Sequence, residues 1–238
     1  MAVGIATAAV AVGAAFLLTG GGSEPAGPRA LTSDEADRLA ITRFRNYEAR
    51  GRAVTITVPG TAGGLTVTGS VDYRGRIGYG VVHGTGRETS SEGLIEWTAD
   101  SVFVHPMANA PEHAPASPPR TGWVRRPLLS AGSSLDTSLT IALGLGSDRP
   151  DNAGLLAQNG AAWWGRDRVD GHPVDVMTGP SSRNRPDTAG NVRYWVGPDG
   201  TMRRVRAEVG SAPRPVDITF DTQPFRPVTP VAGAAPKN

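Results

Sequence analysis

Short stretches of alternating apolar and polar residues, separated by tight turns, recur along most of the chain. The stretch Ala53–Val58 alternates and is rich in β-branched residues, as expected for a strand with one buried face. Asp72–Gly75 and Gly197–Gly200 place turn residues between two such stretches, so each predicts a hairpin. Consecutive strands joined by tight turns run antiparallel. The predicted strands are 53–58, 65–71, 76–82, 94–98, 102–105, 122–126, 161–169, 174–178, 191–196, 202–209 and 216–220.

Helical patterns are separate from these strands. Thr32 followed by Glu35 forms a capping box, and apolar residues at three- and four-residue steps follow it. Gly51 is expected to end this first helix in a left-handed conformation. Shorter helices are predicted at 134–143 and 152–159, between two groups of strands. Helices segregated from an antiparallel sheet indicate the α+β class.

Composition excludes several classes of function. The chain has no cysteine, so disulfides, thiol catalysis and thiolate metal sites are excluded. Its net charge is +2, and no short segment is dense in Lys or Arg, so we predict no nucleic-acid partner.

No arrangement of residues indicates catalysis. The four histidines are far apart in the sequence, and none has a second ligand at metal-binding spacing. No Gly-x-Ser-x-Gly segment is present. The glycines between Gly75 and Gly86 do not open a helix as a phosphate-binding loop would, and are expected to relieve a bent or bulged strand. We therefore predict a protein that is not an enzyme, with no metal site and no cofactor.

The N-terminal segment indicates where in the cell the protein is located. Residues 2–19 contain no charge and are almost all apolar, close to the minimum length for a membrane-spanning helix. The segment Leu18-Thr19-Gly20 resembles a bacterial lipoprotein signal, but Gly21 stands where the lipid-bearing cysteine would be. Residues 1–22 are therefore predicted to be a membrane anchor or a cleaved signal peptide, and residues 23–30 a flexible tether. Both alternatives place the domain outside the cytoplasm.

The aromatic residues raise the question of a ligand. Adjacent pairs on strands, Trp163/Trp164 and Tyr194/Trp195, must point to opposite faces of the sheet. One member of each pair is expected to face the helices, and the other needs a second cover or lines a cavity. An ordinary core with an amphipathic rim and a concave, ligand-accommodating sheet both remain open.

Two segments resemble the LolA/LppX-type family of exported lipoproteins, and specifically its LppX/LprG-like branch. Trp164–Val176 contains a Val-Asp-Gly turn, and Val192–Val205 contains a Trp-bearing strand, an Asp-Gly turn and a returning strand. The resemblance implies a curved antiparallel half-barrel, covered by the N-terminal helix and the two short helices, whose apolar concavity holds acyl chains. It covers residues 31–221 as the domain and leaves residues 222–238 as a Pro-rich tail. The candidate cavity-lining residues are Leu39, Phe44, Trp97, Phe103, Trp123, Trp163 and Trp195.

These features favour a membrane-tethered, extracytoplasmic protein that binds a lipid or another apolar small molecule and contacts the membrane through residues 2–19. The alternative is an envelope interaction or sensing module without a small ligand, in which a sheet edge or the Pro-rich loop at 106–119 meets a partner protein. A packed cavity would favour the second.

Overall fold

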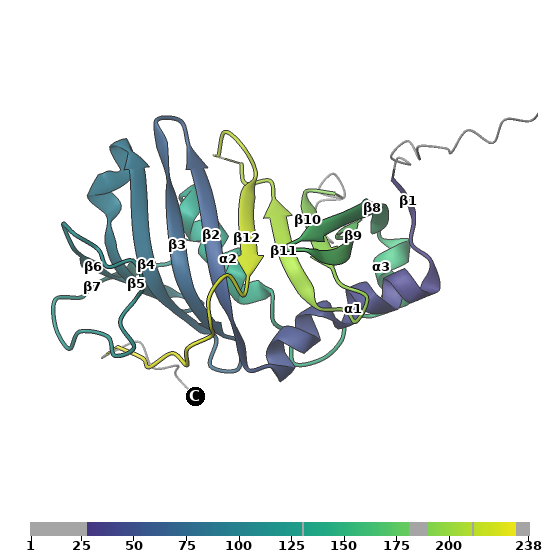
Figure 1. Ribbon diagram of the computed structural model, residues 1–238, viewed down its shortest axis with the longest axis horizontal. Helices are drawn as coiled ribbons and strands as arrows, with labels where there is room; N and C mark the ends of the chain where they lie inside the picture. Colours follow the sequence, from purple (N-terminus) through teal and green to yellow (C-terminus); the bar gives the residue numbers. More distant parts are fainter. Residues whose placement is uncertain (1–27, 130, 181–189, 211, 232–238) are drawn as a thin grey trace, which may run out of the picture.

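A computed structural model of the chain describes residues 28–129, 131–180, 190–210 and 212–231 (Figure 1). Within these residues the structure has twelve strands, three α-helices and one short 3-10 helix. The helices are α1 (Ser33–Glu48), α2 (Ser134–Gly144) and α3 (Ala153–Gln158), and the 3-10 helix η1 is Arg87–Ser91. The strands are β1 (Arg29–Ala30), β2 (Gly51–Gly60), β3 (Gly63–Asp72), β4 (Ile77–Gly86), β5 (Gly93–Trp97), β6 (Ser101–Pro106), β7 (Val124–Pro127), β8 (Ala162–Val169), β9 (His172–Thr178), β10 (Val192–Val196), β11 (Met202–Ala207) and β12 (Val216–Phe220).

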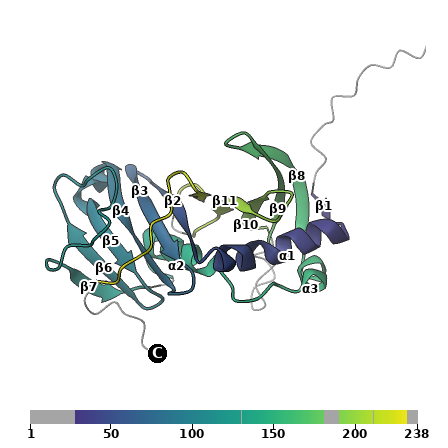
Figure 2. The same ribbon diagram turned by 60° about the horizontal axis from the view of Figure 1, so that its bottom comes forward.

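All twelve strands form one antiparallel sheet built from two meanders. Strands β2 to β7 pair in sequence order, as do β8 to β12, and the two meanders join where β12 pairs with β2. The short strand β1 extends the other edge beside β8. The sheet is curved and open, with the helices apart from it in sequence, which confirms the α+β half-barrel class (Figures 1 and 2). The predicted hairpins are all present, and β1 and η1 were not predicted.

Helix α1 begins at the predicted capping box. The Thr32 hydroxyl accepts a hydrogen bond from the Glu35 N–H, and the Glu35 carboxylate accepts one from the Thr32 N–H. Arg29 donates two hydrogen bonds of 2.7 Å to the same carboxylate and lowers the pKa of Glu35 to about 2. The capping box therefore also fixes β1 against the start of the helix.

The Thr32→Ala variant is expected to lower the free energy of unfolding by about 1 kcal/mol, because the Glu35 N–H loses its acceptor. Urea denaturation measures this loss. Thr121→Ala, at an exposed position with no cap, is the matched control. Equal stability of both variants and the parent chain would show that the cap contributes nothing.

The end of α1 differs from the prediction. Arg50, and not Gly51, adopts the left-handed conformation, with φ of 68°. Gly51 is the first residue of β2, where a Cβ would lie 2.4 Å from the Val71 carbonyl oxygen and 2.5 Å from the Phe225 ring. The glycine is therefore required by close packing, one residue after the turn itself.

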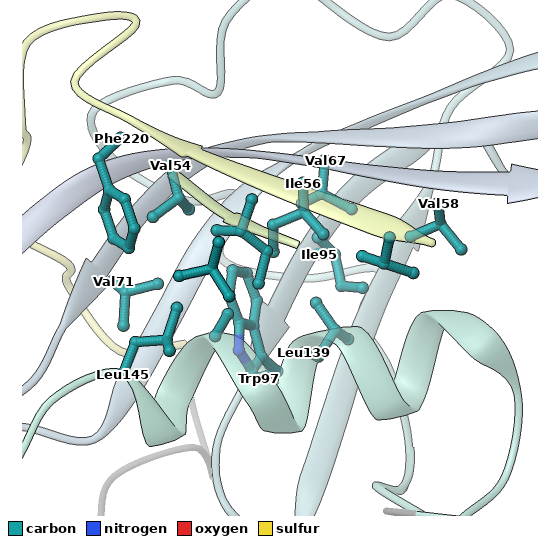
Figure 3. Packing of buried hydrophobic residues seen from close by; sticks show 14 of the residues in the cluster. Val54, Ile56, Val58, Val67, Val71, Ile95, Trp97, Leu139, Leu145 and Phe220 are labelled. Carbon is teal, nitrogen blue, oxygen red and sulfur yellow. The ribbon is translucent and has the colours of Figure 1, made fainter. Parts of the chain in front are cut away.

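The main hydrophobic core lies between the sheet and α2, on what we call the helix face of the sheet (Figure 3). The Trp97 indole is fully buried at its centre, against Leu139 of α2 and the valines of β2 and β3. A Cβ at Gly78 would lie 2.2 Å from the Trp97 ring, and β3 and β4 pair there without a register shift. Of the two roles predicted for the β4 glycines, relief of a bulge is therefore wrong at this position, and relief of a bend stays a prediction. Gly78 makes room for Trp97.

The opposite side of the sheet, the outer face, is covered by the C-terminal segment and the Pro-rich loop. Residues 222–231, which we call the strap, run across β2 to β5 and pack on this face (yellow in Figure 1). Arg52 fixes the start of the strap, because its guanidinium binds the Asp221 carboxylate, the Asn46 side-chain oxygen and the Met202 carbonyl. The boundary predicted at residue 221 stays a prediction, while the first ten residues beyond it lie against the sheet.

In the described ranges no helix has the length and apolarity to cross a membrane. The predicted anchor at residues 2–19 and most of the tether lie outside those ranges.

Candidate functional site

A hollow of about 230 Å³ lies between α1, α3, β10 and the two residues that follow β9, and we call it the α1 hollow. It lies where the sequence predicts a cavity between the N-terminal helix and the sheet. The stripe of α1 supplies Leu39, α3 supplies Leu156, and β10 supplies Val192 and Tyr194. Among the described residues, its lining is Leu39, Thr42, Arg43, Asp151, Leu156, Gly179, Pro180, Val192 and Tyr194.

One wall of the α1 hollow carries an ion pair. The Arg43 guanidinium binds the Asp151 carboxylate through two hydrogen bonds of 2.5 and 3.0 Å, and the Gly144 carbonyl accepts a third at 3.3 Å. The hydrogen bonds to Asp151 raise the pKa of Arg43. The chain around Asp151 is held in place by its own N–H, which donates to the Ala40 carbonyl at 2.9 Å. Each of the three guanidinium nitrogens of Arg43 therefore donates a hydrogen bond, while the Asp151 carboxylate keeps acceptor capacity.

Tyr194 supplies a polar group inside the apolar part of the hollow. Its ring packs with Leu39, Leu156 and Met177, and burial raises the pKa of its hydroxyl. The electrostatic influence of Arg43 lowers this pKa and that of Asp151 raises it, so the phenol lies near the ion pair. A Cβ at Gly179 would lie 3.6 Å from the hydroxyl, so the glycine leaves space beside the phenol. The hollow thus combines apolar walls with the Tyr194 phenol and the Asp151 carboxylate, which could orient a bound molecule.

A second hollow, of about 370 Å³, lies at the β2–β3 hairpin, and we call it the hairpin hollow. Val58 and Leu65 of the hairpin and Leu135 of α2 form its apolar walls, and polar side chains of η1 and of the start of α2 form its rim. In the part of the chain that the structure describes, the lining is Val58, Pro59, Gly60, Thr61, Gly64, Leu65, Glu88, Ser91, Ser133, Ser134, Leu135 and Pro213.

Packed side chains fill the helix face under α2. Trp97, Leu139 and Ala142 are fully buried there, and they belong to the core cluster that also contacts Leu65 beside the hairpin hollow and Tyr194 beside the α1 hollow. Free space on the helix face is therefore found toward the edges of α2 and α1, and the concave centre is a solid core.

The predicted site residues do not come together in one place. Leu39 lines the α1 hollow, and Trp163 packs in the same cluster with Leu156 and Tyr194. Trp97 is in the core under α2, and Phe44 is half-buried on α1, apart from the residues that line either hollow.

The remaining three candidates lie on the outer face. Phe103 and Trp123 pack together beneath the strap, and Trp195 packs with Val169 and Val174 at the β8–β9 hairpin. Adjacent aromatic residues do point to opposite faces, as the alternation predicted. The Arg193 guanidinium lies over the Trp164 ring, with its Cζ atom 4.0 Å from the ring centroid, while Trp163 faces α1.

Sequence reasoning missed Tyr194, Arg43 and Leu156 as site residues. The alternation of side chains along a strand could have identified Tyr194. Tyr194 and Trp195 must point to opposite faces of the sheet, and only one of the two can face the helices. No local pattern indicates that Arg43 meets Asp151, since the two are 108 residues apart. Within the described ranges, no group of three or more His, Asp or Glu could hold a metal ion.

The chain is similar in structure to two solved proteins. One is a LolA superfamily protein of Nitrosomonas europaea, with 11% identity and a TM-score of 0.31, covering 84% of this chain and 96% of that one. The other is a domain of Vibrio parahaemolyticus named for outer membrane lipoprotein sorting, with 9% identity and a TM-score of 0.27, covering 80% of this chain and 92% of that one. Both TM-scores are below 0.5, so neither structure carries an inference about the ligand of this chain. No family model matches the sequence, and no curated protein matches it.

Proposed function

We propose that this chain is an extracytoplasmic binding protein of the bacterial cell envelope that holds one acyl chain, or a similar apolar ligand, in the α1 hollow. The observation that supports this most directly is the space between α1 and the sheet that no described side chain fills. A 150 Å³ apolar cavity is enough to bind benzene, and the α1 hollow is larger, about 230 Å³. Each methylene buried there would contribute about 0.8 kcal/mol to binding.

The polar groups of the hollow favour an amphiphile over a pure hydrocarbon. Asp151 and Tyr194 offer an acceptor and a hydroxyl at the wall, while Leu39 and Leu156 offer apolar contact. A ligand with an apolar chain and a hydrogen-bonding end would use both. The proposed role is binding and release, without a chemical step.

The proposed location comes from the sequence. Residues 2–19 would keep the domain at the membrane, or residues 1–22 would be removed after export, with the folded domain beginning near residue 31. The motif resemblance to the LppX/LprG-like branch supports the same class of protein.

A second candidate is an envelope interaction module without a small ligand. The observation that favours it is the packed centre of the helix face, where Trp97 and Leu139 leave no space under α2. Ligand binding in the α1 hollow separates the two candidates.

The Val192→Trp variant is expected to weaken binding of a dansyl-labelled fatty acid by about tenfold or more, because the indole would occupy the α1 hollow. The measurement is a fluorescence titration of residues 28–238, which include every described element. Leu65→Trp is the matched control, since it places the same side chain in the hairpin hollow.

Each outcome assigns the ligand differently. Loss of binding in Val192→Trp alone supports the α1 hollow, whereas loss in Leu65→Trp alone would move the ligand to the hairpin hollow. No saturable binding by the parent protein, together with no lipid in native mass spectra after purification, would favour the interaction module.

A further inference from the structure

The strap contacts the outer face with a repeat of three residues. Phe225, Val228 and Val231 are half-buried or buried, and the residues between them are exposed. Phe225 covers Gly51, Val228 contacts Tyr79 and Trp123, and Val231 packs on Phe103.

Prolines follow the same repeat. Pro224, Pro227 and Pro230 are exposed and each precedes one of the three inward residues. Proline fixes φ and removes a backbone donor, and a polyproline II helix has three residues per turn. The strap therefore presents one apolar row to the sheet, and its prolines hold it extended at low entropic cost.

The outer face provides acceptors for the strap. The Ser70 hydroxyl accepts the Arg226 N–H at 3.0 Å, and the Glu96 carboxylate accepts the Val231 N–H at 3.1 and 3.2 Å. The Gly69 carbonyl accepts from the Gln223 side chain. Ser70 and Glu96 lie in one cross-strand row with Tyr79 between them, so the acceptors follow the direction of the strap.

We infer that the outer face of β2 to β6 is a binding groove for an extended, proline-rich peptide with an apolar residue at every third position, and that the strap is its intramolecular ligand. The partner that fits is a proline-rich segment of this pattern from another protein, which would compete with the strap. This inference is independent of the acyl-chain proposal, because the groove is on the face opposite the α1 hollow.

The recognition combines three contacts that a peptide in trans can reproduce. Two apolar side chains fill the positions of Val228 and Val231, two backbone N–H groups reach Ser70 and Glu96, and the prolines stay outside. As a tethered segment, the strap has an effective concentration in the millimolar range, so it outcompetes a weak free peptide.

The test separates the strap from the folded chain after folding. A recognition sequence for a site-specific protease is inserted after Thr222, which is exposed, and the purified full chain is then cut at that sequence. We expect native mass spectrometry to show the released strap still bound, and a synthetic peptide of residues 223–231 to displace it. The control peptide carries Val228→Asp and Val231→Asp and should displace it about tenfold or more less effectively.

The uncut chain provides a second arm. A fluorescently labelled peptide of residues 223–231 should bind the uncut parent chain about tenfold or more less tightly than the full chain carrying Val228→Asp and Val231→Asp, whose own strap no longer fits. Release of the strap on cutting with no binding of added peptide would overturn the inference, and so would equal displacement by both peptides. A folded double variant, checked by circular dichroism, that does not take up the labelled peptide would overturn it as well.

Discussion

At about pH 8 the Glu96→Gln variant is expected to exceed the parent chain in free energy of unfolding by about 2 kcal/mol. Glu96 is fully buried on the outer face, and burial raises the pKa of its carboxyl from 4.5 to about 7. The hydrogen bond from the Val231 N–H lowers that pKa without cancelling the effect of burial. The neutral amide of glutamine keeps an acceptor for the same N–H and removes the buried charge.

The direction with pH follows from the two pKa values. In the unfolded chain Glu96 loses its proton near pH 4.5, whereas in the folded chain it keeps the proton to about pH 7. Between these values the folded state binds more protons, so its stability falls as pH rises, by about 3 kcal/mol in all. Below about pH 4.5 the carboxyl is protonated in both states, and the variant should match the parent within about 1 kcal/mol.

The cross-strand neighbours of Glu96 do not contribute to this pH dependence. Across the sheet it is flanked by Tyr79 and Phe103, and Arg125 lies over the Phe103 ring with its guanidinium bonded to the Ser101 hydroxyl. Burial, with Glu96 as the second cause, raises the pKa of Tyr79 to about 12. Tyrosine ionisation therefore does not contribute between about pH 4 and pH 8.

Urea denaturation of parent and variant across this pH range measures the difference. Glu112→Gln, at an exposed position of the Pro-rich loop, is the matched control and should follow the parent at every pH. A difference between Glu96→Gln and the parent that stays constant with pH would contradict a raised pKa at Glu96.

Trp97→Ala is expected to lower the free energy of unfolding by about 3–5 kcal/mol, the largest effect of any substitution considered. The indole is fully buried at the centre of the core under α2, and its removal leaves a cavity that the sheet cannot close. Trp97→Phe should cost much less, because the buried Trp97 Nε1–H has no hydrogen-bond partner among the described residues and its loss removes an unfavourable desolvation. Thermal and urea denaturation of both variants measure the two losses.

Gly78 provides the control for this explanation. A Cβ there would lie 2.2 Å from the Trp97 ring, so Gly78→Ala should destabilise the parent chain by about 1–3 kcal/mol. In the Trp97→Ala background the same change should cost little, because the ring is gone. A double-mutant cycle measures this coupling, and additive losses would show that Gly78 does not serve to accommodate the indole.

Much of the fold follows from local sequence. The hairpins at Asp72–Gly75 and Gly197–Gly200 and the Thr32 capping box depend on a few neighbouring residues, and all were predicted. The pairing of β12 with β2 was not, because no turn joins strands that are more than 150 residues apart. The helix that covers each part of the sheet is likewise set by contacts between distant segments.

The candidate site was also predictable only in its local features. Alternation placed Trp163 and Trp164, and Tyr194 and Trp195, on opposite faces, but not which face borders free space. Trp97 was expected at a cavity and instead fills the core, because Gly78 on the neighbouring strand gives its ring room. Residues 222–238 were predicted to be a Pro-rich tail, and the packing of Phe225, Val228 and Val231 at every third position was not predicted.

The position of β12 has a consequence for how the chain reaches its fold. The last strand in sequence lies in the middle of the sheet, and without it β11 and β2 have no partner on that side. The first meander can assemble on its own early in synthesis, but the union of the two halves waits for residues 216–220. A chain emerging from a pore with its N-terminus first would thus keep the β2 and β11 edges unpaired until almost its entire length had emerged.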